Sequence, residues 1–141
     1  MFKRILVATD GSEHARLAFQ KAAELAKQTG AEIVLLHVAY TPEALGYVLT
    51  DGATVVQEQF TVNGEAVLDI TTRGIDTTGI AVEKKVRPGH PAAVIIAETE
   101  ITGSDLVVMG SRGYGAIAGS LLGSVSQKVL QHANCPVMVV K

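Results

Sequence analysis

The sequence is poor in the residues that form disulfides, metal clusters and stacking surfaces. It has one cysteine, Cys135, so neither an internal disulfide nor a cysteine metal cluster can form. Cys135 precedes Pro136 at the start of an apolar segment, and we expect it to be a small buried hydrophobic residue rather than a reactive thiol. Tryptophan is absent, tyrosine and phenylalanine number three each, and a net charge of -2 is spread without blocks. A nucleic-acid surface, which needs a basic stripe and stacking aromatic residues, is therefore not expected.

Long hydrophobic segments are also missing, although 48% of the residues are hydrophobic. The longest apolar runs have only the length of a strand, so no membrane-spanning helix is predicted. The start of the chain resembles a short signal peptide, but Thr9 and Asp10 end its apolar run too early. We therefore expect a cytoplasmic protein, and the length of 141 residues predicts one domain over residues 1–141.

What the sequence does contain is an alternation of short apolar strands with helical segments. Four runs are almost continuously apolar, and a weaker fifth over 80–86 alternates. Continuous apolar strands are typical of a sheet that is covered on both faces. The four runs are Ile5–Ala8, Ile33–Val38, Leu106–Met109 and Val137–Val140.

Three helices are predicted between these strands from the residues at their ends. The first follows Ser12 and stops at Gly30, the second opens at Pro91 and stops at Gly103, and the third covers about 124–133. Strands that alternate with helices pair in parallel through right-handed crossovers. The sequence thus predicts an α/β fold, a single doubly wound parallel sheet with helices on both faces.

The region between 40 and 79 carries the weakest signal. Glycine and proline interrupt residues 40–54, and a helix over roughly 55–72 follows with Gly64 inside it. A glycine within a helix costs about 1 kcal/mol relative to alanine. The region is either a lid over a ligand site or an ordinary surface excursion, and the second interpretation is favoured.

Three segments are expected to meet at the carboxyl edge of the sheet, where doubly wound folds bind ligands. They are residues 8–12, 37–39 and 110–113. Asp10 is placed to accept a ribose hydroxyl or to orient a hydrated metal ion, but it is equally suited to an Asx turn with nearby backbone. The backbone N–H and C=O of Val38 are candidates for reading an adenine edge.

The most specific motif is a glycine-rich loop after the strand 106–109. Gly110, Gly113, Gly123 and Ser124 follow the pattern G-x2-G-x9-G-S and lead into the last helix. Glycine lets the backbone approach a ligand closely, and the first amides of a helix offer donors and a partial positive charge. The loop therefore predicts a cradle for phosphate.

Two other phosphate-binding motifs fit less well. A P-loop needs a lysine after its last glycine, whereas Gly123 is followed by Ser124 and Val125. Residues 113–118 match G-x-G-x-x-A, the dinucleotide fingerprint, but they lie late in the chain and no acidic residue follows at the distance that reads ribose.

Five stretches in sequence order together resemble the universal stress protein family. They cover both ends and the centre of the chain and leave out about 40–79: Ile5–Ser12, Leu35–Val38, Asp105–Gly113, Leu121–Ser126 and Cys135–Val140. The resemblance implies a five-stranded parallel sheet in the order 3-2-1-4-5. It also implies a homodimer through the last strand, Val137, Met138, Val139 and Val140, whose open edge would otherwise invite aggregation.

In the ATP-binding branch of this family the glycine pattern holds the nucleotide, and this chain keeps the pattern. The resemblance implies that the first two strand ends surround adenine and ribose. It implies further that 110–113 follow ribose and the first phosphates, and that 123–126 take the outer phosphates through amides and hydroxyls. The implied ligand-binding residues are Ala8, Thr9, Asp10, Val38, Gly110, Ser111, Arg112, Gly113, Gly123, Ser124, Val125 and Ser126. Arg112 either adds a cation to the phosphates or is solvated. Mg2+ is expected with ATP, ADP or AMP, and Asp10 is its candidate contact through water.

The favoured function is a stress-response regulator that binds adenine nucleotide as a homodimer. The alternatives are a slow ATP hydrolase or phosphoryl transferase, and a structural dimerisation module with an empty pocket. Efficient phosphoryl transfer needs a P-loop lysine or equivalent, firmly held Mg2+ and a base. The four histidines, His14, His37, His90 and His132, do not lie in a pattern typical of a base, so no catalytic residue is predicted.

Overall fold

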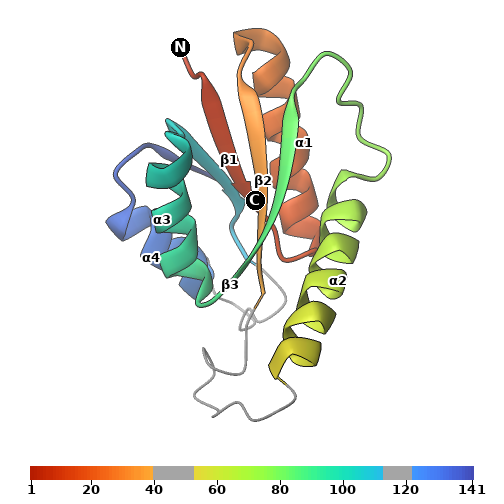
Figure 1. Cartoon of the computed structure of the whole chain (residues 1–141). Coiled ribbons are helices and arrows are strands. Elements are labelled where there is room, and N and C mark those ends of the chain that lie inside the picture. The colour runs from red at the N-terminus through yellow and green to blue at the C-terminus, as the bar shows by residue number, and fades with distance from the viewer. Residues whose placement is uncertain (40–52, 113–121) are drawn as a thin grey trace.

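The computed structural model describes residues 1–39, 53–112 and 122–141, with the backbone alone for 53–62. Strands and helices alternate along the described chain, as Figure 1 shows. In chain order the elements are β1 (Arg4–Ala8), α1 (Glu13–Thr29), β2 (Glu32–Ala39), α2 (Ala53–Thr72), β3 (Val82–Pro88), α3 (Pro91–Thr102), β4 (Leu106–Gly110), α4 (Ser124–His132) and β5 (Val137–Val140).

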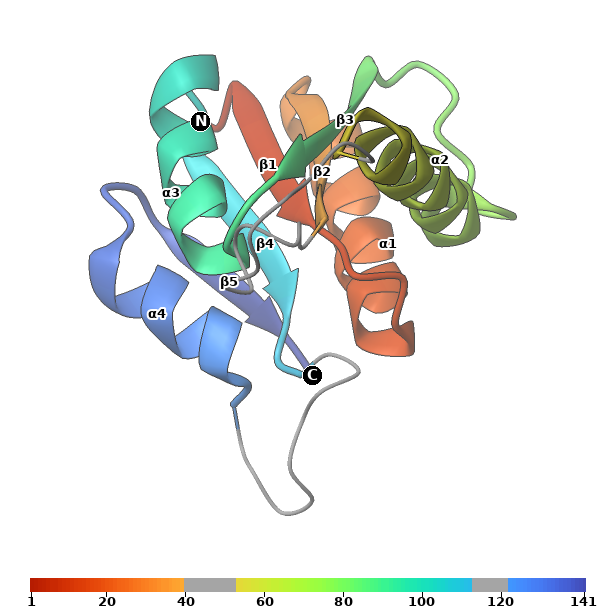
Figure 2. The ribbon, with the colours of Figure 1, turned by 60° about the horizontal axis from the view of Figure 1, so that its bottom comes forward.

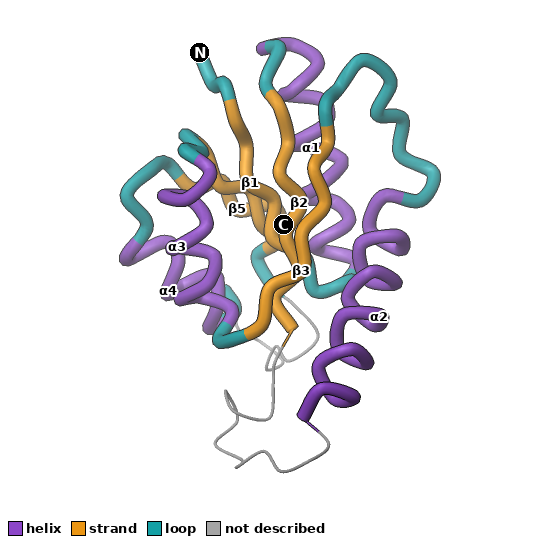
Figure 3. Tube along the Cα trace, viewed as in Figure 1, coloured by secondary structure: helices purple, strands orange, loops and turns teal. Residues whose placement is uncertain are grey.

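The five strands form one parallel sheet in the order β3-β2-β1-β4-β5, which confirms the predicted fold class and strand order. The central strand β1 lies between β2 and β4, and Val7 is opposite Leu35 on one side and Val108 on the other. The tube in Figure 3 shows the strands side by side between two groups of helices.

The helices cover the sheet in two layers, α1 and α2 on one face and α3 and α4 on the other (Figures 1 and 2). Phe19 of α1 is fully buried on the first face, and Val129 of α4 is fully buried on the second. Both faces of β1 are therefore in the core, as its continuous apolar sequence predicts. In the described part of the chain no helix is long and apolar enough to span a membrane.

The predicted helix ends are confirmed where capping residues mark them. Ser12 Oγ accepts a hydrogen bond from Ala15 N–H at 3.3 Å and caps α1. Gly30 ends the same helix with φ of 76°, in the left-handed region that glycine enters without strain. Pro91 occupies the first turn of α3, where its missing N–H leaves no bond unmade.

The central region differs from its prediction in its limits. β3 covers Val82–Pro88 rather than 80–86, and α2 begins at residue 53. Gly64 has a packing reason, because a Cβ on it would lie 2.7 Å from Val86 Cγ1 and 3.3 Å from His37 Cδ2. The helix accepts the cost of glycine there because only glycine lets it pack this closely on the sheet. The candidate lid segment 40–52 lies outside the described residues.

Edge strand β3 is joined to α3 by a buried carboxylate. Glu98 is 2% exposed, and its Oε1 accepts from Arg87 Nε at 2.8 Å. Lys85 Nζ lies 3.5 Å from Glu98 Oε2. Two cations thus neutralise one carboxylate that would otherwise be costly to bury.

Cys135 departs slightly from expectation, because it is half-buried rather than buried. It packs against the apolar cluster beneath α3 and α4. Burial, and after it the negative charge of Asp105, raises the pKa of the Cys135 thiol. A raised pKa lowers the thiolate fraction, so the predicted lack of reactivity agrees with this environment.

Candidate functional site

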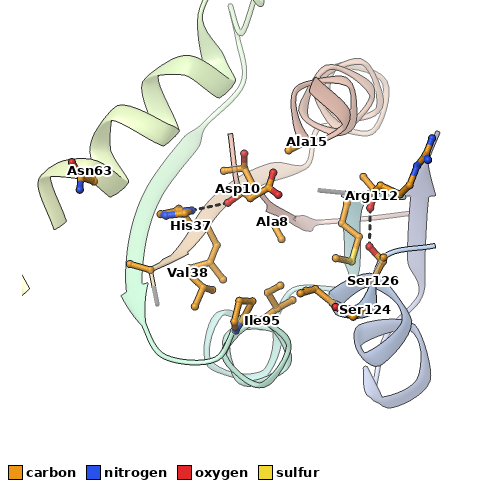
Figure 4. Close-up of a pocket in the computed structure, with 18 residues that line it drawn as sticks. Ala8, Asp10, Ala15, His37, Val38, Asn63, Ile95, Arg112, Ser124 and Ser126 are labelled. Carbon is orange, nitrogen blue, oxygen red and sulfur yellow. Dashed lines mark hydrogen bonds between the residues drawn. The ribbon is translucent and has the colours of Figure 1, made fainter. Parts of the chain in front are cut away.

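A cavity of about 480 Å3 lies at the carboxyl edge of the sheet, where β1, β2 and β4 end and α4 begins. The crossover helix α1 leaves β1 over one face, whereas α3 reaches β4 over the other, so the strand ends diverge between β1 and β4. Figure 4 shows the side chains around this opening, with Ile95 of α3 and Val38 of β2 on one wall.

Ten of the predicted ligand residues line the cavity: Ala8, Thr9, Asp10, Val38, Gly110, Arg112, Gly123, Ser124, Val125 and Ser126. Ser111 does not line the wall. It is only 3% exposed, and its backbone forms hydrogen bonds with Val140 and Gly123. Gly113 lies outside the described residues. Segments far apart in sequence therefore reach one hollow.

After the end of β1, Asp10 forms an Asx turn, one of the two roles that its sequence position left open. Its Oδ1 accepts from Ser12 N–H at 2.9 Å, and the exposed side chain stands at the mouth of the cavity. Asp10 is the one carboxylate among the described residues that line the wall. No group of three or more potential metal ligands is found in the described part of the chain, so no preformed protein-only metal centre is present there.

The end of β2 presents backbone groups to the cavity. Thr9 N–H donates to Leu36 O at 2.9 Å, which places the backbone groups of Leu36 on the side of β1. Backbone groups alternate in direction along a strand, so those of Val38 face the same side, beyond the last residue of β1. The β1–β2 ladder ends at Ala8 and Leu36, and among the described residues no backbone group of the β1 side pairs with Val38.

His37 also belongs to the wall, as expected for the segment 37–39, although no role in ligand binding was predicted for its side chain. It is half-buried, and its Nδ1 lies 2.8 Å from Thr9 O. Because a carbonyl oxygen can only accept, Nδ1 carries the hydrogen of this bond. The bond, drawn in Figure 4, joins the ends of β1 and β2.

Gly110, the first glycine of the motif, is required by packing. A Cβ on Gly110 would lie 2.8 Å from the backbone carbon of His14 and 2.9 Å from its oxygen. Such contacts are far inside van der Waals distance, and a helix backbone has little freedom to move away. The close approach of α1 to β4 therefore explains this glycine without a ligand.

At the other end of the motif, α4 begins with its donors toward the cavity. Gly123 occupies the N-cap position, and no side chain caps the helix within the described residues. Gly123 N–H donates to Ser111 O at 2.7 Å, and Gln127 N–H begins the helical pattern by donating to Gly123 O at 3.0 Å. The amides of Ser124, Val125 and Ser126 lie in the first turn, where a helix has donors without a helical partner.

The Ser126 side chain has a structural bond. Its Oγ donates to Gly110 O at 2.8 Å, and the residue is 4% exposed. This bond ties α4 to the end of β4 across the motif (Figure 4). The hydroxyl proton is thereby used, which leaves the Ser126 amide as its donor to a ligand.

Arg112 brings positive charge to the wall, but its direction is outward. Figure 4 shows its guanidinium pointing away from the interior of the cavity. Within the described wall, no carboxylate forms a hydrogen bond or ion pair with the Arg112 guanidinium. The side chain is half-buried, and its long stem allows other rotamers.

Sequence reasoning missed the apolar wall on the α3 side. Pro91 and Ile95 line the cavity from α3, and Met109 and Leu36 do so from the strands. In the sequence these residues have the same pattern as any core position. No signal separates them from the core, because only the divergence of the strand ends leaves them facing a hollow.

Comparison with known proteins identifies the family. The family model described as "Universal stress protein family" matches residues 1–141. A universal stress protein of Thermus aquaticus is 37% identical over 142 residues, with all of both chains covered. The solved structure of the hypothetical protein MJ0577 superimposes with a TM-score of 0.87 at 29% identity, and 100% of this chain and 96% of that one are covered.

A third comparison is more distant. The structure of an Arabidopsis thaliana family protein, described as having AMP bound, gives a TM-score of 0.68 at 24% identity and covers 99% of this chain and 91% of that one. Taken with the match of the family model to every residue of the sequence, these likenesses show that the chain belongs to the universal stress protein family.

Proposed function

We propose that the chain binds an adenine nucleotide, ATP first among the candidates, in the cavity at the carboxyl edge of the sheet. The observation that carries the proposal is one hollow with an apolar wall on one side and the uncapped start of α4 on the other. Its volume of about 480 Å3 lies in the range of small-molecule pockets. A flat base fits the apolar wall, and phosphates fit the first turn of α4.

The end of β2 favours adenine over guanine. The Val38 N–H and C=O together offer a donor and an acceptor to a base that lies against Val38 and Ile95. Adenine answers with the acceptor N1 and the amino group N6, whereas guanine in the same orientation presents a donor at N1 and an acceptor at O6, the reverse order. A buried mismatch of that kind leaves polar groups unpaired, so guanine nucleotides should bind more weakly.

The phosphates are assigned to the segment 123–126. The N-terminal amides of α4 and the partial positive charge of this helix end lie at the cavity, and Gly123 adds no side chain that would block access to them. Arg112 would add a cation after a change of rotamer, and Gly113 belongs to the same predicted cradle. Mg2+ would arrive with the triphosphate and contact Asp10 through water, since one carboxylate supplies too few ligands for a protein-only site.

We favour nucleotide binding without efficient hydrolysis or phosphoryl transfer. The described wall contains no lysine, its arginine, Arg112, points away from the cavity, and its one imidazole, His37, uses Nδ1 to hold Thr9 O. Phosphoryl transfer needs a cationic clamp and a group that positions the nucleophile. We therefore propose a cytoplasmic regulatory protein whose state depends on nucleotide occupancy and whose chains pair through β5.

A thermal-shift panel tests this function. Melting temperatures are measured with Mg-ATP, Mg-ADP, AMP, cyclic AMP and Mg-GTP at equal concentrations. A ligand at a hundredfold excess over its Kd stabilises the folded state by about 2.7 kcal/mol. The proposal expects a clear rise with ATP and a much smaller one with GTP. No rise with any adenine nucleotide would support the structural module with an empty pocket.

A further inference from the structure

A buried threonine of α2 connects that helix to the wall of the cavity. Thr71 is 0% exposed and does not line the cavity itself. Its Oγ1 lies 2.7 Å from Val67 O and 2.7 Å from Thr9 Oγ1. Thr9 directly follows the last residue of β1 and immediately precedes Asp10. The core of α2 therefore touches the loop at the mouth of the cavity through two hydroxyls.

The direction of these bonds follows from donor chemistry. A carbonyl oxygen only accepts, so Thr71 Oγ1 donates its one hydrogen to Val67 O. Thr9 Oγ1 must then donate to Thr71, and it accepts from Gly11 N–H at 3.0 Å. A continuous chain of hydrogen bonds thus runs from Gly11 through Thr9 and Thr71 to Val67. In a buried setting such chains strengthen one another.

Thr9 is also held by its peptide groups. Its N–H donates to Leu36 O at 2.9 Å, and its carbonyl accepts from His37 Nδ1 at 2.8 Å. β2 therefore fixes the main chain of Thr9, and α2 fixes its side chain. All the polar groups of Thr9 therefore have partners. The fixed position of Thr9 sets where the loop with Asp10 and Gly11 leaves the sheet.

We propose that Thr71, acting through Thr9 and Gly11, is a positioning residue for Asp10 at the mouth of the cavity. The inference rests on the proposed nucleotide site for its functional consequence. Without the Thr71 hydroxyl, Thr9 Oγ1 loses its acceptor inside the core and turns to another partner. Its bond from Gly11 N–H then changes, and the Asp10 carboxylate leaves the position from which it meets a ribose hydroxyl or hydrated Mg2+.

The same helix supplies a matched control. Thr72 Oγ1 bonds back to Leu68 O at 3.2 Å, as Thr71 does to Val67, but Thr72 is only half-buried and has no bond to Thr9. Thr71→Val and Thr72→Val therefore remove the same kind of helix bond. Only Thr71→Val removes the link to the cavity, and Thr71→Ser keeps the hydroxyl that makes it.

The experiment measures the Kd for Mg-ATP and the amide NMR shifts of the nucleotide-free proteins. Thr71→Val should raise Kd about five- to tenfold, the effect of one misplaced hydrogen-bonding group. Thr72→Val and Thr71→Ser should stay within about twofold of the wild type. In the nucleotide-free protein, the amide signals of Asp10 and Gly11 should move in Thr71→Val and stay in place in Thr72→Val.

The outcomes separate this inference from the proposed function. If the wild type binds no nucleotide, the proposed function fails, and the shifts of Asp10 and Gly11 alone decide the inference. A Thr71→Val protein with a lower melting temperature but unchanged Kd and unchanged Gly11 signal overturns it, since Thr71 would then be structural only. Should Thr71→Val fail to fold, the wild type decides: slowly exchanging hydroxyl protons on Thr9 and Thr71 support the bond chain, and rapid exchange of both refutes it.

Discussion

At the scale of single residues, the two glycines of the motif that the structure describes, Gly110 and Gly123, have different reasons to be glycine. Gly110 is forced by the backbone of His14, which leaves no room for a Cβ. Gly123 has ordinary backbone angles, φ of -69° and ψ of 159°, and stands at the start of α4 beside the cavity. Gly110 is therefore required by packing, whereas Gly123 lines the cavity without a side chain.

Gly110→Ala should destabilise the protein even without nucleotide. The added methyl group pushes α1 away from β4, and overpacking of this kind costs about 1–3 kcal/mol. Gly123→Ala is the matched variant from the same motif and should cost less in the nucleotide-free protein, about 0.5–1 kcal/mol, because alanine is a poorer N-cap for α4 than glycine. Urea unfolding of both proteins measures the difference. Equal stability of the two variants would show that Gly110 tolerates a side chain.

The Cys135 thiol should react slowly. Burial, followed by the charge of Asp105, raises its pKa, so less thiolate is present at neutral pH than for a free cysteine. Alkylation rates with iodoacetamide across pH should show a midpoint above that of the same protein unfolded in urea. Because the native state then holds its proton longer than the unfolded state, stability should fall as pH rises through this interval. A native midpoint below the unfolded one would contradict this account.

At the scale of elements, the amino-terminal edge of the sheet depends on Asp105. Its carboxylate accepts from the N–H of Lys3 and Arg4, at 2.9 Å and 3.1 Å, and so joins the start of β1 to the start of β4. Burial alone would raise the pKa of Asp105, but these backbone donors outweigh it and hold the pKa below its ordinary value.

Asp105→Asn should therefore lower the melting temperature at neutral pH. A carboxyl group with a depressed native pKa stabilises the fold above its unfolded pKa, and this stabilisation is lost as pH falls through the native pKa. The gap in melting temperature between wild type and Asp105→Asn should narrow in acid, because the wild-type carboxylate becomes protonated. A gap of constant size from neutral pH to strong acid would show that the charge of Asp105 has no part in stability.

The elements were predictable wherever local chemistry decides them. Ser12, Gly30, Pro91 and Gly103 mark helix ends through bonds or backbone angles that depend on a few neighbouring residues. The limits of the edge strand β3 differ from the predicted 80–86 because its sequence is largely charged and gives a weak pattern. Its pairing with β2 sets the limits instead. The reason for glycine at position 64 is equally non-local, since it is the close approach of Val86 and His37 that leaves no room for a side chain there.

The candidate site was predictable in its backbone and not in its walls. The strand ends and the glycine pattern are visible in sequence because their roles need particular residue types. Ile95, Pro91 and Met109 are apolar residues like those of the core, and only the divergence of β1 and β4 exposes them to a hollow. The hydrogen bond between Thr71 and Thr9 joins residues 62 positions apart, and a threonine at either position does not predict it.

At the scale of the whole molecule, the two edges of the sheet differ in character. β3 carries Glu83, Lys84, Lys85 and Arg87, and charged edge strands resist pairing with another chain. β5 has the sequence VMVV, and its Met138 is 39% exposed. Of the two edges, β5 is the one suited to meet a second copy, which is the basis for the proposed homodimer.

Met138→Lys should shift the proposed dimer to monomer. A lysine at the β5 edge places a charge where the second copy would pair, whereas Glu83→Lys reverses a charge at the opposite edge and should leave the dimer intact. Light scattering after size exclusion reports the mass of each variant and of the wild type. A monomeric wild type, or a Met138→Lys protein that stays dimeric, would contradict pairing through β5.

The central claim is that the hollow between the ends of β1, β2 and β4 and the start of α4 holds an adenine nucleotide. Equilibrium dialysis of the wild type with radiolabelled ATP and Mg2+ tests it most directly. The account predicts close to one nucleotide bound per chain, displaced by unlabelled ATP but far less by GTP. Retention no greater than that of a nonbinding control protein, or displacement by GTP as effective as by ATP, would contradict it.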